Sequence, residues 1–268
     1  MACMLAGSPV MAVPGAWEAF TTEAHAQAWA LFDFADNGLY AAAWQDEEDP
    51  FVLTGTVEDN AVWLFADEAG GQDALLGDYR LVEAIRVDLY VDDPDGIDIV
   101  DLALSVQVNG ETRYVYSPVK DENDFPLQGW EPIRFSLSEP WFFLNADDEF
   151  EPIVLTSEIL ETVAEAGIRI FPKQGVIDQF YAVDNFQLEA LLIEPVMTSG
   201  MAGARFRIQM QPDPGIEYEL QTWSASWGAV GGVDPINGTE PFSYRAPAGD
   251  GGIFRFAMSP FFTEIEAP

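Results

Sequence analysis

Cysteine, histidine and lysine are almost absent from this chain of 268 residues. It contains one cysteine, Cys3, one histidine, His25, and two lysines, Lys120 and Lys173. A single cysteine excludes an intrachain disulfide and any cysteine-rich zinc or iron–sulfur site, and a single histidine excludes sites built from several imidazoles. The lack of disulfides is a mild indication of a cytosolic protein, or of a compartment where folding relies on the core alone.

Positive charge is also scarce. The 46 Asp and Glu residues outnumber the 11 Lys and Arg residues, which leaves a formal net charge of -35. Nucleic acid and anionic membrane surfaces are therefore excluded as partners, and no stretch approaches the roughly 18–20 apolar residues that span a bilayer. Because 49% of residues are hydrophobic and 13% aromatic, we predict a folded protein with a large core rather than an acidic disordered chain.

Short apolar or alternating runs recur between turn residues, a pattern typical of antiparallel β structure and not of a parallel α/β sheet. The dipeptide Asn109-Gly110 between two such runs predicts a type I′ hairpin turn, since both positions tolerate positive φ. In the first 193 residues the predicted strands are 29–34, 51–56, 61–65, 79–90, 98–108, 112–117, 133–136, 168–171 and 180–191.

Helix signals are few. The segment 157–166 is predicted as a helix with Ser157 as N-cap and Gly167 as the stop, and its apolar residues form one stripe. The segment 17–28 is a second candidate for a short helix or a lead-in, although two threonines weaken helix formation there.

The composition changes near residue 193. Ile193-Glu194-Pro195 and a Met, Ser and Gly stretch up to Gly203 predict a domain junction. Beyond it, short strands at 204–210, 218–222, 227–230, 242–245 and 253–258 predict a small β-module. The predicted organisation is a tail over 1–16, a large β domain over 17–193, a linker over 194–203, the small module over 204–260 and a tail over 261–268.

The first twelve residues are small and apolar. Val10-Met11-Ala12 has the small-residue spacing of a signal-peptidase site, but no basic segment precedes it. Two interpretations remain open, a truncated signal peptide and a disordered N-terminal tail.

Two segments of the large domain resemble strands of galactose-binding-like β-jelly-roll domains, which occur in many carbohydrate-binding modules. The run DQFYAVDNFQL at 178–188 resembles their closing strand, and LFDFADNG at 31–38, followed by Trp44, resembles their first strand. The resemblance covers roughly residues 17–193. It implies a mostly β protein, an antiparallel jelly-roll sandwich with one short helix, followed here by the small β-module.

The small module resembles a second family. EYELQT at 217–222, SWGAV at 226–230 and the aromatic-Arg strand at 254–256 are similar to a short C-terminal β-module of exported Planctomycetes and Verrucomicrobia proteins, although Ile253-Phe254-Arg255 replaces the usual Phe-Tyr-Arg. This resemblance implies a secreted or cell-surface protein.

The jelly-roll resemblance also implies a structural Ca²⁺ ion between the first and last strands. It places ligands at Asp184 and at Asp33 or Asp36. Asp carboxylates and backbone carbonyls supply the six to eight oxygens that Ca²⁺ takes. The alternative is that these residues cap turns or face water.

Sugar binding by such modules usually relies on exposed aromatic rings that stack on pyranose faces. Our candidates are Trp44, Trp130, Trp141 and Tyr116, each with packing in the core or at its rim as the alternative. Trp63 lies in an apolar run and is interpreted as a core residue.

No motif indicates a particular reaction. A Gly-x-Ser-x-Gly elbow, a phosphate-binding glycine-rich loop and the Glu-x-Asp-x-Glu strand of sandwich-fold glucanases are all absent, and we interpret His25 as packed or solvated. We therefore predict a non-catalytic extracellular binding or adhesion protein with a carbohydrate ligand. Two alternatives stay open: a structural component of an extracellular matrix or surface layer, and a glycan-active hydrolase, which needs only two carboxylates.

Overall fold

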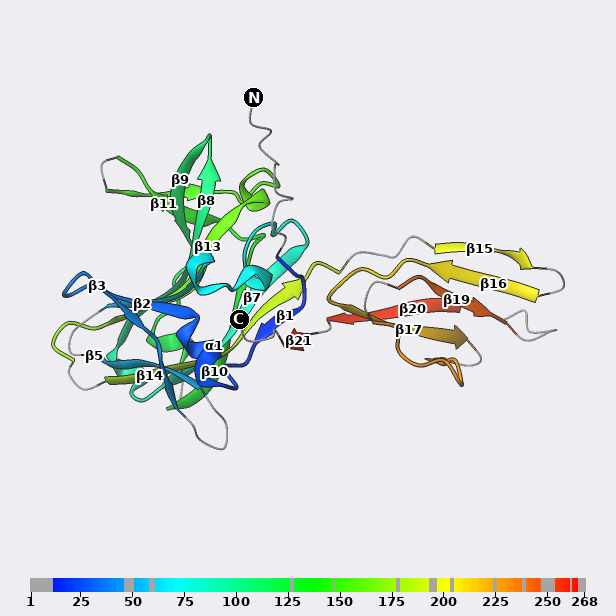
Figure 1. The fold of residues 1–268 in the computed structure, drawn as a ribbon, viewed down its shortest axis with the longest axis horizontal. Coiled ribbons are helices and arrows are strands. Elements are labelled where there is room, and N and C mark those ends of the chain that lie inside the picture. The colour runs from blue at the N-terminus through cyan, green and yellow to red at the C-terminus, as the bar shows by residue number, and fades with distance from the viewer. Residues whose placement is uncertain are drawn as a thin grey trace, which may run out of the picture.

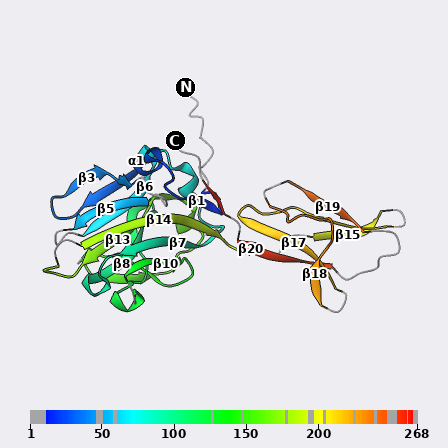
Figure 2. The ribbon, with the colours of Figure 1, turned by 90° about the horizontal axis from the view of Figure 1, so that it is seen from below.

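The computed structural model describes residues 12–45, 51–57, 61–125, 128–146, 148–176, 179–192, 197–202, 205–223, 226–237, 240–246, 254–260 and 262–264. Two sheets pack into a sandwich, and a smaller β-module extends from one end of it (Figure 1, Figure 2). In the described part the only α-helix is α1 (Glu23–Gln27), which Thr22 caps. The prediction of a mostly β, antiparallel sandwich with one short helix is confirmed.

One layer of the sandwich is an eight-stranded antiparallel sheet, and it forms the surface that matters most below. Its strands, in spatial order, are β12 (Phe150–Ile153), β11 (Trp141–Leu144), β9 (Glu111–Tyr116), β8 (Ile97–Val108), β13 (Val163–Pro172), β6 (Val62–Asp67), β2 (Trp29–Asp33) and β3 (Gly38–Ala41). The turn between β8 and β9 is the predicted hairpin, with φ of 54° at Asn109 and 81° at Gly110.

The other layer is a seven-stranded sheet. Its main path is β10 (Gly129–Ser136), β7 (Val82–Val91), β14 (Gln179–Ala190), β1 (Ala16–Glu18) and β21 (Thr263–Glu264), while β5 (Phe51–Val57) pairs with β14 and β4 (Ala43–Gln45) pairs with β5. Side chains that alternate along the strands of both layers meet between them. Leu64, Leu102 and Ile168 from one sheet, with Val87 and Leu188 from the other, belong to one buried core.

The C-terminal module consists of two three-stranded sheets. One is β15 (Met197–Ala202), β16 (Arg205–Met210) and β19 (Phe242–Arg245), and the other is β18 (Trp227–Ala229), β17 (Ile216–Trp223) and β20 (Phe254–Pro260). Its strands include those predicted at 218–222 and 242–245. The segment predicted as linker contains β15, because pairing with β16 satisfies its backbone groups.

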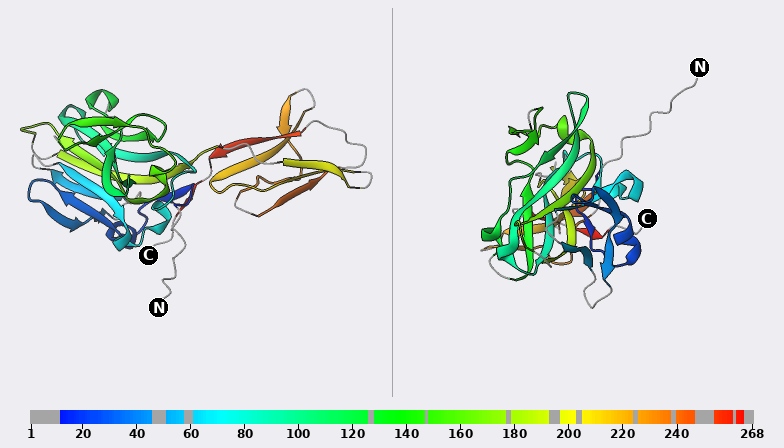
Figure 3. Two further views of the ribbon diagram at one scale, coloured as in Figure 1. Left: turned by 90° about the horizontal axis from the view of Figure 1, so that it is seen from above. Right: turned by 90° about the vertical axis from the view of Figure 1, so that its left-hand side faces the viewer.

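The chain returns from this module to the sandwich. The short strand β21, in the segment predicted as a tail, pairs in parallel with β1 at the end of the sandwich that faces the module (Figure 1, Figure 3). Thr21 Oγ1 donates a hydrogen bond of 2.8 Å to Glu264. Ala190 at the end of β14 packs in the core of the module with Ile216 and Tyr218. Gly215 has a φ of 74° and lies so close to Pro14 that a β-carbon would be 2.5 Å from the Pro14 carbonyl oxygen. The two parts are therefore joined at more than one point.

The prediction of a helix over 157–166 is wrong. Only a 3-10 turn, η5 (Ile159–Glu161), forms there, and β13 starts at Val163. β13 is hydrogen-bonded to β6 on one side and to β8 on the other. Two ladders of backbone hydrogen bonds together with burial of alternate side chains outweigh the local helix signals, whose contributions are small. The remaining 3-10 turns are η1 (Glu68–Gly70), η2 (Asp73–Leu75), η3 (Pro94–Gly96) and η4 (Glu122–Asp124).

Candidate functional site

The outer face of the eight-stranded sheet carries an aromatic groove. Along β6, β8 and β13 the residues facing away from the core alternate with core residues, so that Trp63, Asp101 and Arg169 lie on one surface. Neighbouring strands add the aromatic rings of Tyr114 and Tyr116 from β9. Two adjoining hollows make up this aromatic groove.

The first hollow has a volume of about 360 Å³. Its walls combine aromatic rings with two charged side chains from β13, and its lining residues are Phe32, Phe34, Trp63, Phe65, Ala103, Tyr114, Tyr116, Glu165 and Arg169. The Trp63 ring stacks on Phe65 at 4.1 Å between centroids and meets the Tyr114 ring edge-on at 5.3 Å. These packed neighbours hold the aromatic surface in place.

The second hollow has a volume of about 470 Å³ and is more apolar. It shares Phe34, Tyr116 and Arg169 with the first hollow and extends toward β11 and β12; the other lining residues are Ile99, Asp101, Ser117, Val119, Phe142, Phe150 and Phe171. Because three residues line both hollows, one ligand can occupy both. Each volume lies in the range of about 300–1,000 Å³ that is usual for ligand pockets.

Arg169, which lines both hollows, belongs to a buried ion pair. Arg169 donates from Nε to Asp101 Oδ1 at 2.7 Å and from Nη2 to Asp101 Oδ2 at 2.6 Å. Its guanidinium carbon lies 3.8 Å from the centroid of the Tyr116 ring, a cation–π contact. A guanidinium has five N–H groups, so this fixed arginine keeps donors beyond the two that Asp101 accepts.

The first hollow also offers a carboxylate, Glu165 of β13. Tyr114 donates a 2.8 Å hydrogen bond from its hydroxyl to Glu165 Oε2. Burial, with the adjacent Glu165 charge, raises the pKa of Tyr114, and burial raises the pKa of Tyr116, so both phenols stay protonated at neutral pH. A carboxylate has about four acceptor positions, which leaves Glu165 able to accept hydrogen bonds from ligand hydroxyls.

The structure places only one of the predicted ligand-binding aromatics, Tyr116, in the groove. Trp141 is fully buried and donates to Ser136 O, and Trp44 packs against the core and donates to Phe20 O at 2.8 Å. Their rings fill the interior.

Trp130 is 43% exposed but lies on β10 of the other sheet, where it meets Tyr90 edge-on. The four predicted residues therefore do not form one site, because they are distributed over both sheets and the core.

Sequence reasoning missed most of the groove. Trp63 was interpreted as a core residue, yet its neighbour Leu64 points into the core and Trp63 points outward. The available signal was a single charge inside an apolar strand: Arg169 stands between Ile168 and Ile170, and Asp101 between Val100 and Leu102. Opposite charges at such positions of paired strands indicate a buried pair on one face.

The three carboxylates predicted for calcium do not lie together. Asp33 accepts from Ala35 N at 2.8 Å, and Asp36 accepts from Gly38 N and from the Tyr40 hydroxyl, so both cap the turn between β2 and β3. Asp184 lies on β14 in the other sheet and accepts from Asn185 N. Within the described ranges, no three His, Cys, Asp or Glu side chains are grouped as metal ligands. The named residues do not fit a single ion.

Calcium binding itself stays a prediction from the resemblance. If it is correct, millimolar CaCl₂ raises the melting temperature of the EDTA-treated protein, because an ion that binds only the folded state stabilises it. Thermal melts with CaCl₂, with MgCl₂ as the control and with EDTA alone provide the measurement. Identical melting curves in all three would contradict the prediction.

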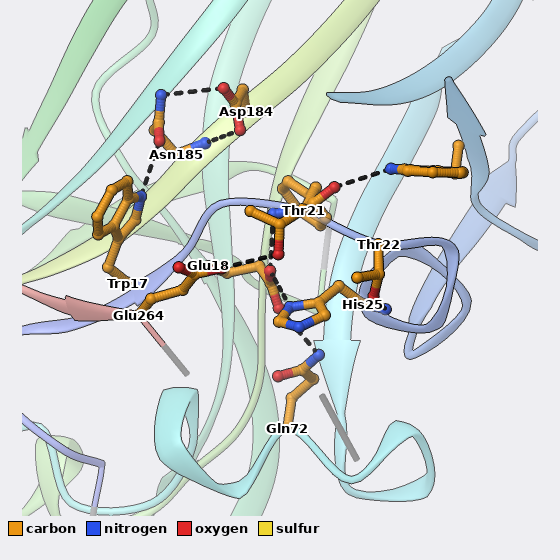
Figure 4. A network of polar contacts seen from close by, with 11 residues as sticks. Trp17, Glu18, Thr21, Thr22, His25, Gln72, Asp184, Asn185 and Glu264 are labelled. Carbon is orange, nitrogen blue, oxygen red and sulfur yellow. Dashed lines mark hydrogen bonds and ion pairs between the residues drawn. The ribbon is translucent and has the colours of Figure 1, made fainter. Parts of the chain in front are cut away.

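The only histidine belongs to a buried polar network at the start of the sandwich (Figure 4). His25 Nδ1 lies 2.6 Å from Glu18 Oε1, and both side chains are almost completely buried. Phe20 N and Gln72 Nε2 also donate to this carboxylate, at 2.8 and 3.3 Å. With no exposed surface for a substrate, the network holds β1 and α1 against the core.

Comparison with solved structures gives distant structural likenesses. No family model and no curated protein matches the chain, and in the described segments no helix is long and apolar enough to cross a membrane. The solution structure of CtCBM11 aligns at a TM-score of 0.35 and 15% identity, over 66% of this chain and 90% of its own. A β-1,2-glucanase from Parabacteroides distasonis aligns at 0.33 and 8%, over 95% of this chain but 39% of its own. Likenesses this distant transfer no function, so function must be inferred from the groove.

Proposed function

We propose that this protein is a non-catalytic glycan-binding protein whose ligand lies along the aromatic groove. The observation that carries the proposal is the combination, on one open sheet face, of aromatic rings with a fixed arginine and a carboxylate. Trp63, Tyr116 and Phe34 offer ring surfaces for the apolar faces of pyranose rings. Arg169 and Glu165 offer a donor and an acceptor for hydroxyl groups.

Charge supports an uncharged glycan over an anionic one. Among the lining residues, Asp101 and Glu165 are acidic and Arg169 is the single cation, already paired with Asp101. The surrounding molecule carries a formal net charge of -35. Its field repels polyanions at moderate ionic strength.

The positions of the carboxylates favour binding over hydrolysis. Glu165 pairs with Ser105 across β13 and β8, and Asp101 lies four residues from Ser105 on β8. At about 3.3 Å per residue the two backbone positions are roughly 13 Å apart. Glycoside hydrolases need two carboxyl groups that act on the sugar, whereas both oxygens of Asp101 are held by Arg169.

The decisive experiment compares two aromatic residues of nearly equal exposure, one in the turn after β2 of the eight-stranded sheet and one on a strand of the other sheet. Phe34, in the groove, is 42% exposed, and Trp130, on β10, is 43% exposed. After affinity electrophoresis in soluble neutral and anionic polysaccharides has identified a ligand, calorimetry measures its Kd. We expect Phe34→Ala to weaken binding at least about tenfold, equivalent to about 1.4 kcal/mol, and Trp130→Ala to leave it unchanged.

Circular dichroism melts of both variants check that each is folded. Loss of binding in Trp130→Ala with none in Phe34→Ala would contradict the assignment to the groove. Failure of every polysaccharide to retard the protein would favour the alternative of a structural component of a matrix or surface layer.

A secreted or cell-surface location accompanies this proposal, since polysaccharide ligands of this kind are extracellular. This location is inferred from the resemblance of the C-terminal module to exported proteins and from the composition of residues 1–12. Residues 1–11 lie outside the described residues. Expression with and without the first twelve residues, followed by fractionation, tests it.

A further inference from the structure

The second hollow differs chemically from the first, although the two are continuous. Beyond the shared Phe34, Tyr116 and Arg169, the second hollow is lined mainly by aliphatic and phenylalanine side chains. Phe150 and Val119 are exposed by 58% and 51%, and the Phe150 ring meets Tyr116 edge-on at 5.7 Å. Large apolar side chains left open to water beside a pocket indicate a ligand that covers them.

The two polar side chains that line only the second hollow, Asp101 and Ser117, are already hydrogen-bonded within the protein. Both oxygens of Asp101 accept from Arg169. Ser117 Oγ accepts from Leu102 N at 2.9 Å and donates to Pro118 O at 3.1 Å. An incoming hydroxyl therefore gains little there, and a sugar ring that loses water on entry would not recover its hydrogen bonds.

We propose that the ligand is a glycan that carries a short alkyl or acyl group, with its sugar in the first hollow and its hydrocarbon in the second. This inference rests on the proposed glycan function. Tyr116 and Arg169 line both hollows, so a sugar seated against them has its substituent at the entrance of the second. The volume of about 470 Å³ accommodates a short hydrocarbon group.

The size and position of the second hollow favour this occupant over a protein partner. It adjoins the first hollow and shares three lining residues with it. Each buried methylene contributes favourably to binding, about 0.8 kcal/mol or close to a fourfold gain in affinity. A substituent of a few carbons thus has a large effect without a large interface.

The test uses methyl and hexyl glycosides of glucose, galactose and mannose, all below their micelle concentrations, with hexanol as the sugar-free probe. For the sugar that binds, we expect the hexyl glycoside to bind at least tenfold more tightly than the methyl glycoside by calorimetry, and hexanol to bind more weakly than either glycoside. Phe150→Ser should remove the gain from the hexyl chain and keep the affinity for the methyl glycoside.

Leu39→Ser is the matched control, because Leu39 is 63% exposed and lines neither hollow. This variant should still bind the hexyl glycoside more tightly than the methyl glycoside. Equal affinity for methyl and hexyl glycosides, or a preference that survives Phe150→Ser, would overturn the inference and leave the glycan function standing. Binding of hexanol as tight as that of the hexyl glycoside would also overturn it, since the sugar would then contribute nothing. Failure of the proposed function itself is separate, because it appears as loss of polysaccharide retardation.

Discussion

Asp101→Ala is expected to destabilise the protein by about 3–5 kcal/mol and to abolish glycan binding. The substitution leaves Arg169 as a buried charge without a partner, and removing one member of a buried ion pair has costs of this size. The Asp101 and Arg169 side chains are only 4% and 11% exposed. Without the carboxylate the guanidinium also loses the bond that fixes it over Tyr116. Urea denaturation measures the stability and calorimetry the binding.

Two further variants separate the roles of this pair. Asp101→Leu combined with Arg169→Met should regain most of the stability, since apolar replacements of a buried pair are often neutral or better, but should remain unable to bind glycan. Arg134→Met removes the exposed arginine that pairs with Glu83 and Glu189 on the other sheet and should change the free energy of unfolding by less than about 1 kcal/mol. A double variant that still binds would show that the arginine is not part of the site.

His25→Ala is expected to lower the free energy of unfolding by about 3–5 kcal/mol at pH 7, because it leaves the Glu18 carboxylate buried without the imidazole that lies 2.6 Å from it. Burial raises the pKa of Glu18 above its ordinary value of 4.5, against the opposing effect of hydrogen bonds from Phe20 and His25. A raised carboxyl pKa favours the folded state below pH 4.5, and that contribution is lost as the pH rises through the folded-state pKa. The difference in free energy of unfolding between wild type and His25→Ala should therefore be small near pH 4 and grow toward neutral pH.

Chemical denaturation of wild type and variant between pH 4 and 8 measures this difference. Glu18→Gln added to His25→Ala removes the charge, so the double variant should recover stability at pH 7 and lose the added pH dependence. If His25→Ala loses the same free energy of unfolding at every pH in this range, lost packing and not the buried charge causes the loss.

Much of the fold is readable in the sequence because its strands alternate. Segments such as 98–108 and 180–191 place large apolar residues on one face, and burial of that face requires a second sheet. The weaker predictions concern short segments with little pattern of their own. β3, β11 and β12 were not predicted, and 157–166 looked helical in isolation but became a 3-10 turn and a strand once paired with β6 and β8.

The candidate site was far less readable. Tyr116 was singled out, whereas Trp63, Arg169 and Asp101 were not. Of the tryptophans predicted to bind the ligand, Trp141 lies in the core and Trp130 on the opposite sheet. Whether an aromatic residue in a strand faces the core or the solvent depends on a register shift of a single residue.

The sequence by itself determined the class of protein. Its single cysteine, its single histidine and its charge of -35 limit the available chemistry, and its alternating apolar runs require an antiparallel sandwich. Only the tertiary structure decided where the site lies. The groove draws Trp63, Tyr116 and Arg169 from three different strands and Phe34 from the turn after β2, and the pairing order of the strands is set by long-range hydrogen bonds and core packing. Residues far apart in the chain become neighbours through that order, which no local pattern encodes.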